Sequence, residues 1–174
     1  MANLDNPRGA RPYGDDLGSS PYKHATSSTV AIYPGDFVKT SGGYVLTATA
    51  VTDRLRGVAK NYAAASSSTT VYVWDNPDQK FVIQDDASAT LTQTAVGKSG
   101  DVLLTTGDTT LKLSKHEIIA SDLATTDGQL RVIGLADTVY TNDVINAWGV
   151  NADLIIQINE HERTVTGSAT ITGT

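Results

Sequence analysis

The sequence predicts a mainly β protein: a small antiparallel β-barrel or sandwich body with an extended N-terminal arm and little helix. Its 174 residues include 24 threonines, and aspartate outnumbers glutamate by 16 to 3. β-Branched and turn-forming residues therefore replace the long side chains that favour helices. Short runs of alternating apolar and polar residues also recur between clusters of glycine, proline, asparagine and aspartate, as in strands joined by tight turns.

Residues 1–28 are predicted to form the extended arm. They contain Pro7, Pro12 and Pro21 with several glycines, and almost no aliphatic pattern. Proline fixes φ, removes a backbone donor and pushes the preceding residue toward an extended conformation, so no helix is expected here. Such an arm is either a disordered terminus or a segment that becomes ordered on a partner.

Residues 29–163 are predicted to form the β-rich body, for which two β subdomains, 29–61 and 69–163, are one possible division. An Ala/Ser-rich stretch between these two parts is expected to be an exposed loop. Residues 164–174 are a Thr/Gly-rich C-terminal tail. A chain of this length is expected to make about one domain.

The strands of the body follow from period-two alternation and turn residues. Ser-Gly-Gly at 41–43 signals a hairpin, and Gly57 indicates a bulge or a close backbone approach. Asp-Asn-Pro-Asp at 75–78 predicts a second hairpin from the strands on either side of it. Residues 88–96 fit a short helix or a strand equally well. The expected strands are 29–33, 37–40, 44–50, 53–61, 69–74, 80–84, 100–105, 110–114, 128–135 and 152–159.

Composition excludes several classes of protein. The chain has no cysteine, so it has no disulfide framework and no thiolate site. A net charge of −6 argues against a nucleic-acid partner, which requires a basic surface. The longest apolar runs are too short to span a membrane, and the N-terminus lacks the pattern of a signal peptide. We therefore expect no nucleic-acid partner, no membrane partner, and a protein made in a cytosol-like compartment.

Catalytic motifs are weak. His24, His116 and His161 have acidic and hydroxyl neighbours in sequence, but no Gly-x-Ser-x-Gly motif accompanies them. Three solvent-exposed histidines are the plainer interpretation. Glycine-rich phosphate loops are also absent from the sequence, so we expect neither an enzyme nor a cofactor.

Metal-binding patterns are equally weak. In a strand, Glu160 and Glu162 would project to one face and His161 to the other, which is a poor geometry for zinc. A charged strand end or an interface pair is the alternative. Aspartates around 75–86 could favour calcium, but their spacing does not match a calcium loop, and aspartate is common in turns. No metal is expected.

Interface residues are the better candidates. Arg8, Arg11, Tyr13 and Tyr22 lie in the predicted arm, and interfaces favour arginine and tyrosine.

Large aromatic residues add a second group of candidates. Trp74 and Trp148, with Tyr140, would form either a sugar-stacking surface or core and subunit contacts. Together with Glu160, His161 and Glu162, the two tryptophans are expected at an interface with another protein subunit.

Several short motifs follow one another along the chain. They are Asn-x-x-x-Pro-x-Gly-x-x-Pro at 3–12, Pro-Gly-Asp-Phe-Val at 34–38, Asp-Arg-Leu-Arg-Gly-Val-Ala at 53–59, Tyr-Val-Trp-Asp-Asn-Pro at 72–77, Phe-Val-Ile-Gln at 81–84, Gln-Leu-Arg-Val-Ile-Gly-Leu at 129–135 and Asn-Ala-Asp-Leu-Ile-Ile-Gln-Ile-Asn-Glu-His-Glu at 151–162. The order of these motifs, over about residues 1–163, resembles the tailed-bacteriophage virion structural proteins of the head decoration, or capsid cement, type. The resemblance implies that the interface residues named above contact either further copies of this chain or the capsid.

This resemblance implies a protein without catalytic activity on the outer surface of the virion. It would bind the assembled head and staple neighbouring major capsid subunits against the pressure of the packaged DNA. The expected partners are the major capsid protein and further copies of this chain, as a homotrimer or a dimer. A glycan- or receptor-binding module, another tail or vertex component, and an enzyme remain as alternatives.

Overall fold

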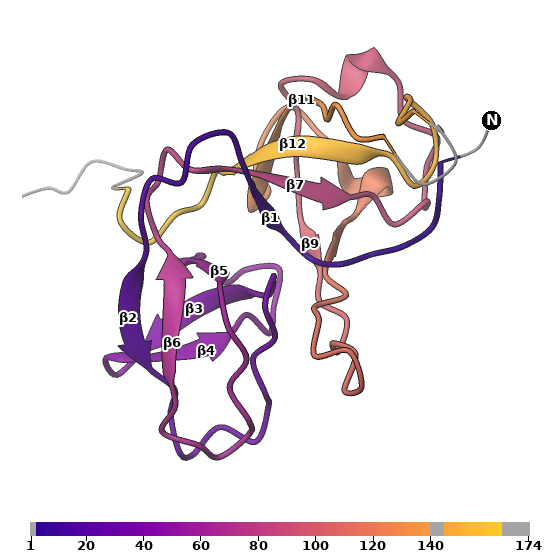
Figure 1. Ribbon diagram of the computed structural model, residues 1–174. Coiled ribbons are helices and arrows are strands. Elements are labelled where there is room, and N and C mark those ends of the chain that lie inside the picture. Colours follow the sequence, from indigo (N-terminus) through magenta and orange to yellow (C-terminus); the bar gives the residue numbers. More distant parts are fainter. Residues whose placement is uncertain (1–2, 140–144, 165–174) are drawn as a thin grey trace, which may run out of the picture.

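The computed structural model describes residues 3–139 and 145–164, and it confirms a mainly β fold (Figure 1). Two five-stranded antiparallel sheets make up the body. They resemble a sandwich and are not closed into a barrel in the described part of the chain. Within that part, no helix is long and apolar enough to cross a membrane.

Each sheet combines strands that are distant in the sequence. Sheet A has the order β1 (Arg11–Tyr13), β7 (Lys80–Gln84), β12 (Asp153–Ile158), β11 (Leu130–Leu135) and β8 (Ser99–Gly100). Sheet B has the order β2 (Ser20–Lys23), β6 (Thr70–Trp74), β5 (Gly57–Ala59), β3 (Phe37–Ser41) and β4 (Tyr44–Thr47). A two-stranded ladder joins β9 (Val102–Leu103) to β10 (Glu117–Ile118). Two short 3-10 helices, η1 (Gln93–Ala95) and η2 (Ala120–Asp122), are the helical elements of the described residues.

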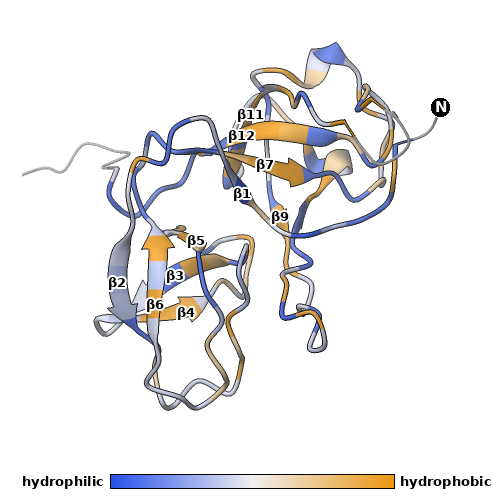
Figure 2. Cartoon of the chain, in the orientation of Figure 1, coloured by the Kyte–Doolittle hydropathy of each residue, from blue (hydrophilic) through white to orange (hydrophobic). Residues whose placement is uncertain are grey.

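One hydrophobic core is shared by the two sheets. Phe37 of sheet B belongs to the same buried cluster as Phe81 and Ile156 of sheet A. The next residue in β3, Val38, points to the opposite face and is equally buried, in a second cluster with Ile32. Sheet B is therefore covered on both faces. The apolar strands of both sheets stand out in Figure 2.

A long antiparallel ribbon connects the two sheets. β1 pairs with β7 in sheet A, and β2 pairs with β6 in sheet B, so residues 11–23 lie against residues 70–82 across both sheets. The Leu17 N–H donates to Oε1 of Gln79 at 2.9 Å, which ties the two crossing segments together. The predicted hairpin of residues 69–84 is therefore wrong: β6 and β7 belong to different sheets, and the turn between them is a crossover.

The N-terminal residues are extended as predicted, but they are part of the body. Asn3 and Ala10 are buried, and β1 and β2 are edge strands of the two sheets. Both edge strands contain a proline, Pro12 or Pro21. A proline cannot donate to a neighbouring strand, so an edge is where sheets accept it. The prolines that suggested a separate arm are thus the signature of edge strands.

The division between the sheets differs from the predicted subdomains 29–61 and 69–163. Because β6 belongs to sheet B, the change of sheet falls at residues 75–79. The Gly-Gly turn at 42–43 confirms the first hairpin, with φ of 56° and 84°. Residues 29–33 form only an isolated bridge, through Ile32 and Ala63, and the ambiguous segment 88–96 contains η1. The predicted tail, apart from its first residue, lies outside the described residues.

The segment between β9 and β10 extends away from sheet A and runs beside sheet B (Figure 1). Two contacts hold it there. Gly107 approaches Tyr33 so closely that an added Cβ would lie 2.4 Å from the ring. Lys112 Nζ lies 4.6 Å from the centroid of the Tyr62 ring. The predicted strand 110–114 is represented here only by an isolated bridge between Asp108 and Leu113.

Candidate functional site

Three of the sequence-predicted interface residues meet at one place. Arg8, Arg11 and Trp74 line a hollow of about 240 Å³, completed by apolar residues that include Pro12 and Leu113. Arg8 and Trp74 are 66 positions apart in the sequence. They are neighbours because Ala10, next to β1, donates its N–H to the Gly35 carbonyl, and Gly35 donates to Ala59 of β5, the strand beside β6.

Arg8 also borders two further hollows. One, of about 210 Å³, lies toward Leu4 and Val139. The other, of about 610 Å³, lies toward the segment between β9 and β10, with Leu111 at its edge. We call the whole region the Arg8 surface. It comprises Arg8, Arg11, Pro12, Trp74, Leu111 and Leu113.

The two guanidinium groups remain accessible although each has a neighbour within the chain. Arg11 Nη2 lies 3.7 Å from Asp153 Oδ2, and about half of the Arg11 side chain is exposed. Arg8 is exposed, and its guanidinium donates to the side-chain oxygen of Asn6 when that amide is oriented to face it. Leu111 is 67% exposed. The Arg8 surface therefore offers two cations beside exposed apolar side chains.

Trp74 serves both the core and this surface. It is half-buried, packs against the shared core and forms one wall of the apolar hollow. Lys60 Nζ lies 5.2 Å from the centroid of its ring. Trp148 is also half-buried against the shared core. Tyr140, the third aromatic candidate, lies outside the described residues.

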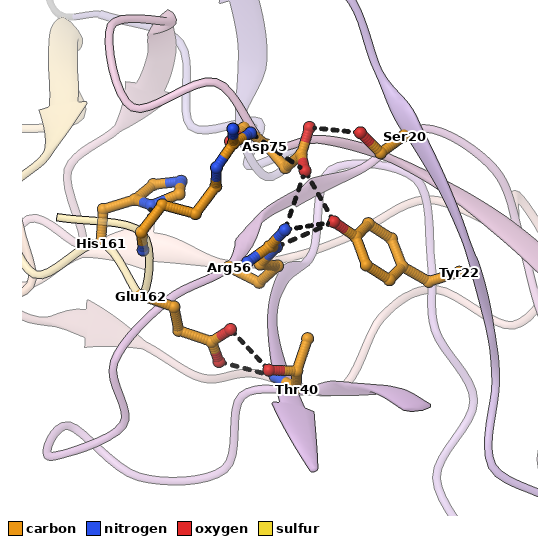
Figure 3. Close-up of polar contacts among 8 residues, drawn as sticks. Ser20, Tyr22, Thr40, Arg56, Asp75, His161 and Glu162 are labelled. Carbon is orange, nitrogen blue, oxygen red and sulfur yellow. Dashed lines mark hydrogen bonds and ion pairs between the residues drawn. The ribbon is translucent and has the colours of Figure 1, made fainter. Parts of the chain in front are cut away.

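Tyr13 and Tyr22 do not belong to the Arg8 surface. Tyr13 is half-buried and packs against the small cluster of Val82, Ala136 and Ile155. Tyr22 donates its phenolic O–H to Asp75 Oδ2 at 2.7 Å, as Figure 3 shows. Both tyrosines are thus used inside the chain, because β1 and β2 are strands of the body.

Asp75 is the centre of a polar cluster at the junction of the sheets (Figure 3). Its carboxylate accepts from Ser20 Oγ at 2.9 Å as well as from Tyr22, and Arg56 Nη2 lies 3.2 Å away. Burial alone would raise the pKa of Asp75. The hydrogen bonds from Tyr22 and Ser20, with the charge of Arg56 and that of Arg163, outweigh burial and lower the pKa below its usual value.

Glu160, His161 and Glu162 form a strap from sheet A to sheet B. The residues follow β12, and His161 makes a parallel bridge with Leu55. Glu162 accepts from the N–H of Thr40 at 2.7 Å and from its hydroxyl at 2.6 Å (Figure 3). His161 is fully buried, whereas both glutamates are partly exposed. This agrees with the expected alternation, in which the glutamates project to one face and His161 to the other. The Glu162 carboxylate, predicted at an interface, therefore makes a contact within the chain.

All three histidines are buried, which overturns their interpretation as solvent-exposed side chains. His116 and Asp36 are a pair that the sequence reasoning missed, because 80 positions separate them and no local pattern links them. A serine is near as well: Ser114 Oγ accepts the backbone N–H of His116 at 3.1 Å. The three do not make a catalytic triad. His116 Nδ1 accepts the Phe37 N–H, so the proton of the neutral ring is on Nε2, and neither ring nitrogen can accept a proton from a serine hydroxyl.

The aspartates predicted as possible calcium ligands are occupied by turns. Asp85 accepts the backbone N–H groups of Ala87 and Ala152, and Asp86 accepts those of Ser88 and Ala120. No group of three histidine, cysteine or acidic residues is arranged to hold a metal ion within the described ranges.

Comparison with known proteins found no relative of this chain. No family model, no curated protein and no solved structure matches the chain.

Proposed function

We propose that this protein is a head decoration, or cement, protein of a tailed bacteriophage, which binds the outside of the assembled capsid and staples neighbouring major capsid subunits. The proposal rests on the motif order described above and on one structural observation, the Arg8 surface. Two accessible guanidinium groups flank an apolar hollow with a tryptophan wall. Arginine and tryptophan are enriched among the few residues that dominate the binding energy of protein interfaces.

The chemistry of the Arg8 surface indicates the partner. An apolar side chain of the capsid protein would fill the hollow, and carboxylates beside it would pair with Arg8 and Arg11. Arginine suits this role because its planar fork binds carboxylates through two hydrogen bonds. The charged lining residues of the apolar hollow are Arg8 and Arg11, on a chain of net charge −6, so a carboxylate of the partner is attracted to this hollow. The two neighbouring hollows also contain the carboxylates of Asp153, Asp5 and Asp108, so their charge is mixed.

The body is suited to bearing load. A shared core, the ribbon of residues 11–23 with 70–82, and the strap at residues 160–162 each join sheet A to sheet B. A force applied at the Arg8 surface would reach both sheets through these connections. We further propose a homotrimer, because several linked weak contacts bind a shell far more tightly than one. A dimer is the alternative symmetry.

The first test is the copy number of this protein in purified particles, measured by quantitative mass spectrometry against the major capsid protein. A decoration protein should approach the abundance of the capsid protein. A dozen copies or fewer would assign it to a vertex or tail, and its absence from particles would overturn the proposal in favour of an enzyme or a separate binding module.

The second test is rebinding of purified variants to particles that lack the protein. The double variant Arg8→Glu/Arg11→Glu should lose capsid occupancy at least about thirtyfold, since each change reverses a charge at the interface. The matched control is Lys23→Glu/Arg131→Glu, which makes the same change of net charge at two exposed positions outside the three hollows. Equal occupancy for the two double variants would remove the Arg8 surface from the interface.

A further inference from the structure

A second pocket lies between sheet B and the segment that leaves β9. Its volume is about 190 Å³. Val30, Ala31 and Leu104 form its apolar wall, and Asp36, His116 and Tyr33 are its titratable lining residues. None of the residues of the Arg8 surface lines it, so we treat it as a separate site, the Asp36 pocket.

The turn at residues 33–36 sets the position of the Asp36 carboxylate. Pro34 and Gly35, with φ of 94° at the glycine, place Asp36 so that its N–H donates to the Tyr33 carbonyl at 3.0 Å. In return, Asp36 Oδ2 accepts the Tyr33 N–H at 2.8 Å. The residue is only 2% exposed, and Oδ1 has no hydrogen-bond partner among the described residues.

His116 faces this free oxygen but does not neutralise it. Its Nε2 lies 3.6 Å from Asp36 Oδ1, beyond hydrogen-bond distance. Its Nδ1 accepts the Phe37 N–H at 3.1 Å, so the single proton of the neutral ring is on Nε2. Burial lowers the pKa of His116 to about 4, so the ring is uncharged at pH 7.

The carboxylate is therefore a buried negative charge without a cation. Burial raises the pKa of Asp36 to about 6, against smaller lowering effects of the Tyr33 N–H and the Ser114 side chain, so most of the carboxyl groups are ionised at pH 7. No lysine or arginine of the described residues pairs with it. Buried charges in proteins are paired, because an unpaired one loses its hydration without replacement.

We propose that the Asp36 pocket binds an alkylammonium group, with the nitrogen at Asp36 Oδ1 and the alkyl chain along Val30, Ala31 and Leu104. The apolar walls match the alkyl chain, and the ammonium supplies both the missing charge and the missing donor. A metal ion is a poorer occupant, because the protonated Nε2 of His116 cannot ligate it and the pocket has a single carboxylate. The group has two sources, a free amine or a lysine side chain of a partner protein.

Calorimetric titration of the full chain tests this proposal with n-butylamine and with 1-butanol, its uncharged analogue of similar size. The ammonium should bind and the alcohol should not. Asp36→Asn should weaken binding of butylammonium at least about thirtyfold, whereas Asp122→Asn, at an exposed position, should leave it unchanged. Equal binding of amine and alcohol, or binding that survives Asp36→Asn, would overturn the proposal.

Two additions keep the test decisive. Ala31→Leu narrows the pocket without removing a polar group, so it should weaken butylammonium binding even if Asp36→Asn fails to fold. Unchanged affinity would count against the pocket.

A lysine capped at both ends distinguishes the two sources of the ammonium group, a free amine and a lysine side chain of a partner protein. Binding equal to that of butylamine supports a partner's lysine, and binding of butylamine alone supports a free amine. The result of this titration does not depend on whether the Arg8 surface binds the capsid.

Discussion

Tyr22 donates its phenolic O–H to Asp75 Oδ2 over 2.7 Å, although the two residues are 53 positions apart. The bond joins β2 to the point at which the chain leaves β6 for sheet A. Arg56, from the other side of β6, donates to the same phenolic oxygen. A tyrosine, an aspartate and an arginine thus close the junction between the two sheets.

Asp75→Asn should lower the free energy of unfolding by about 2 kcal/mol, because the half-buried Arg56 guanidinium and the Tyr22 hydroxyl lose their charged partner. Urea unfolding followed by circular dichroism measures the loss. Asp78→Asn, in the exposed turn nearby, is the matched control and should change stability little. Equal losses for the two variants would contradict a special role for this cluster.

The lowered pKa of Asp75 also predicts how the stability of the protein depends on pH. The pKa of Asp75 is lowered in the folded protein, so its contribution to stability is present above the unfolded value of 3.8 and is lost as the pH falls through the folded value. Unfolding titrations from pH 7 to pH 2 should show an acid loss of stability that is smaller in Asp75→Asn. A loss of the same size in both proteins would assign the acid sensitivity to other groups.

Glu117→Gln should stabilise the protein at alkaline pH. Burial, followed by the charges of Asp5, Asp86 and Asp85, raises the pKa of Glu117 to about 7 in the folded state, against 4.5 for the free side chain. The unfolded chain therefore loses this proton first, and stability falls between about pH 4.5 and pH 7. Melting temperatures at pH 5 and pH 8 should differ less in the variant. An unchanged difference would show that Glu117 does not carry this titration.

Gly57→Ala should destabilise the fold by about 3 kcal/mol. An added Cβ at Gly57 would lie 2.1 Å from the backbone oxygen of Trp74, so β5 and β6 would have to separate. The close backbone approach indicated by the sequence is confirmed by this distance. Gly134→Ala is the control, because a Cβ there meets nothing within 4 Å. Similar melting temperatures for the two variants would contradict the prediction.

Deletion of residues 1–13 should also destabilise the protein, by at least about 2 kcal/mol. It removes β1, buried Ala10 and the ring of Tyr13, and it leaves β7 as an unpaired edge. A separate arm could be removed with no effect on the body. Thermal unfolding of the shortened chain therefore distinguishes an integrated edge strand from an arm, and an unchanged melting temperature would favour the arm.

The candidate site was only partly predictable. Arg8, Arg11 and Trp74 were selected by residue type, which is local information, and they do meet on one surface. Asp36 and His116 carried no local signal, because a turn aspartate and a lone histidine occur in most chains. Tyr22 was expected to reach a partner, yet its hydroxyl is hydrogen-bonded to Asp75 and Arg56 of the same chain.

The sequence by itself determined the β class, most of the strands, the Gly-Gly hairpin and the close approach at Gly57, since alternation and turn chemistry depend on neighbouring residues. Only the tertiary structure decided which strands pair. The turn at 75–78 is compatible with a hairpin and with a crossover, and the choice depends on β1 and β2, about 60 positions earlier, which occupy the edges beside β7 and β6. Such pairings are set by burial of a shared core, a property of the whole chain that no short segment contains.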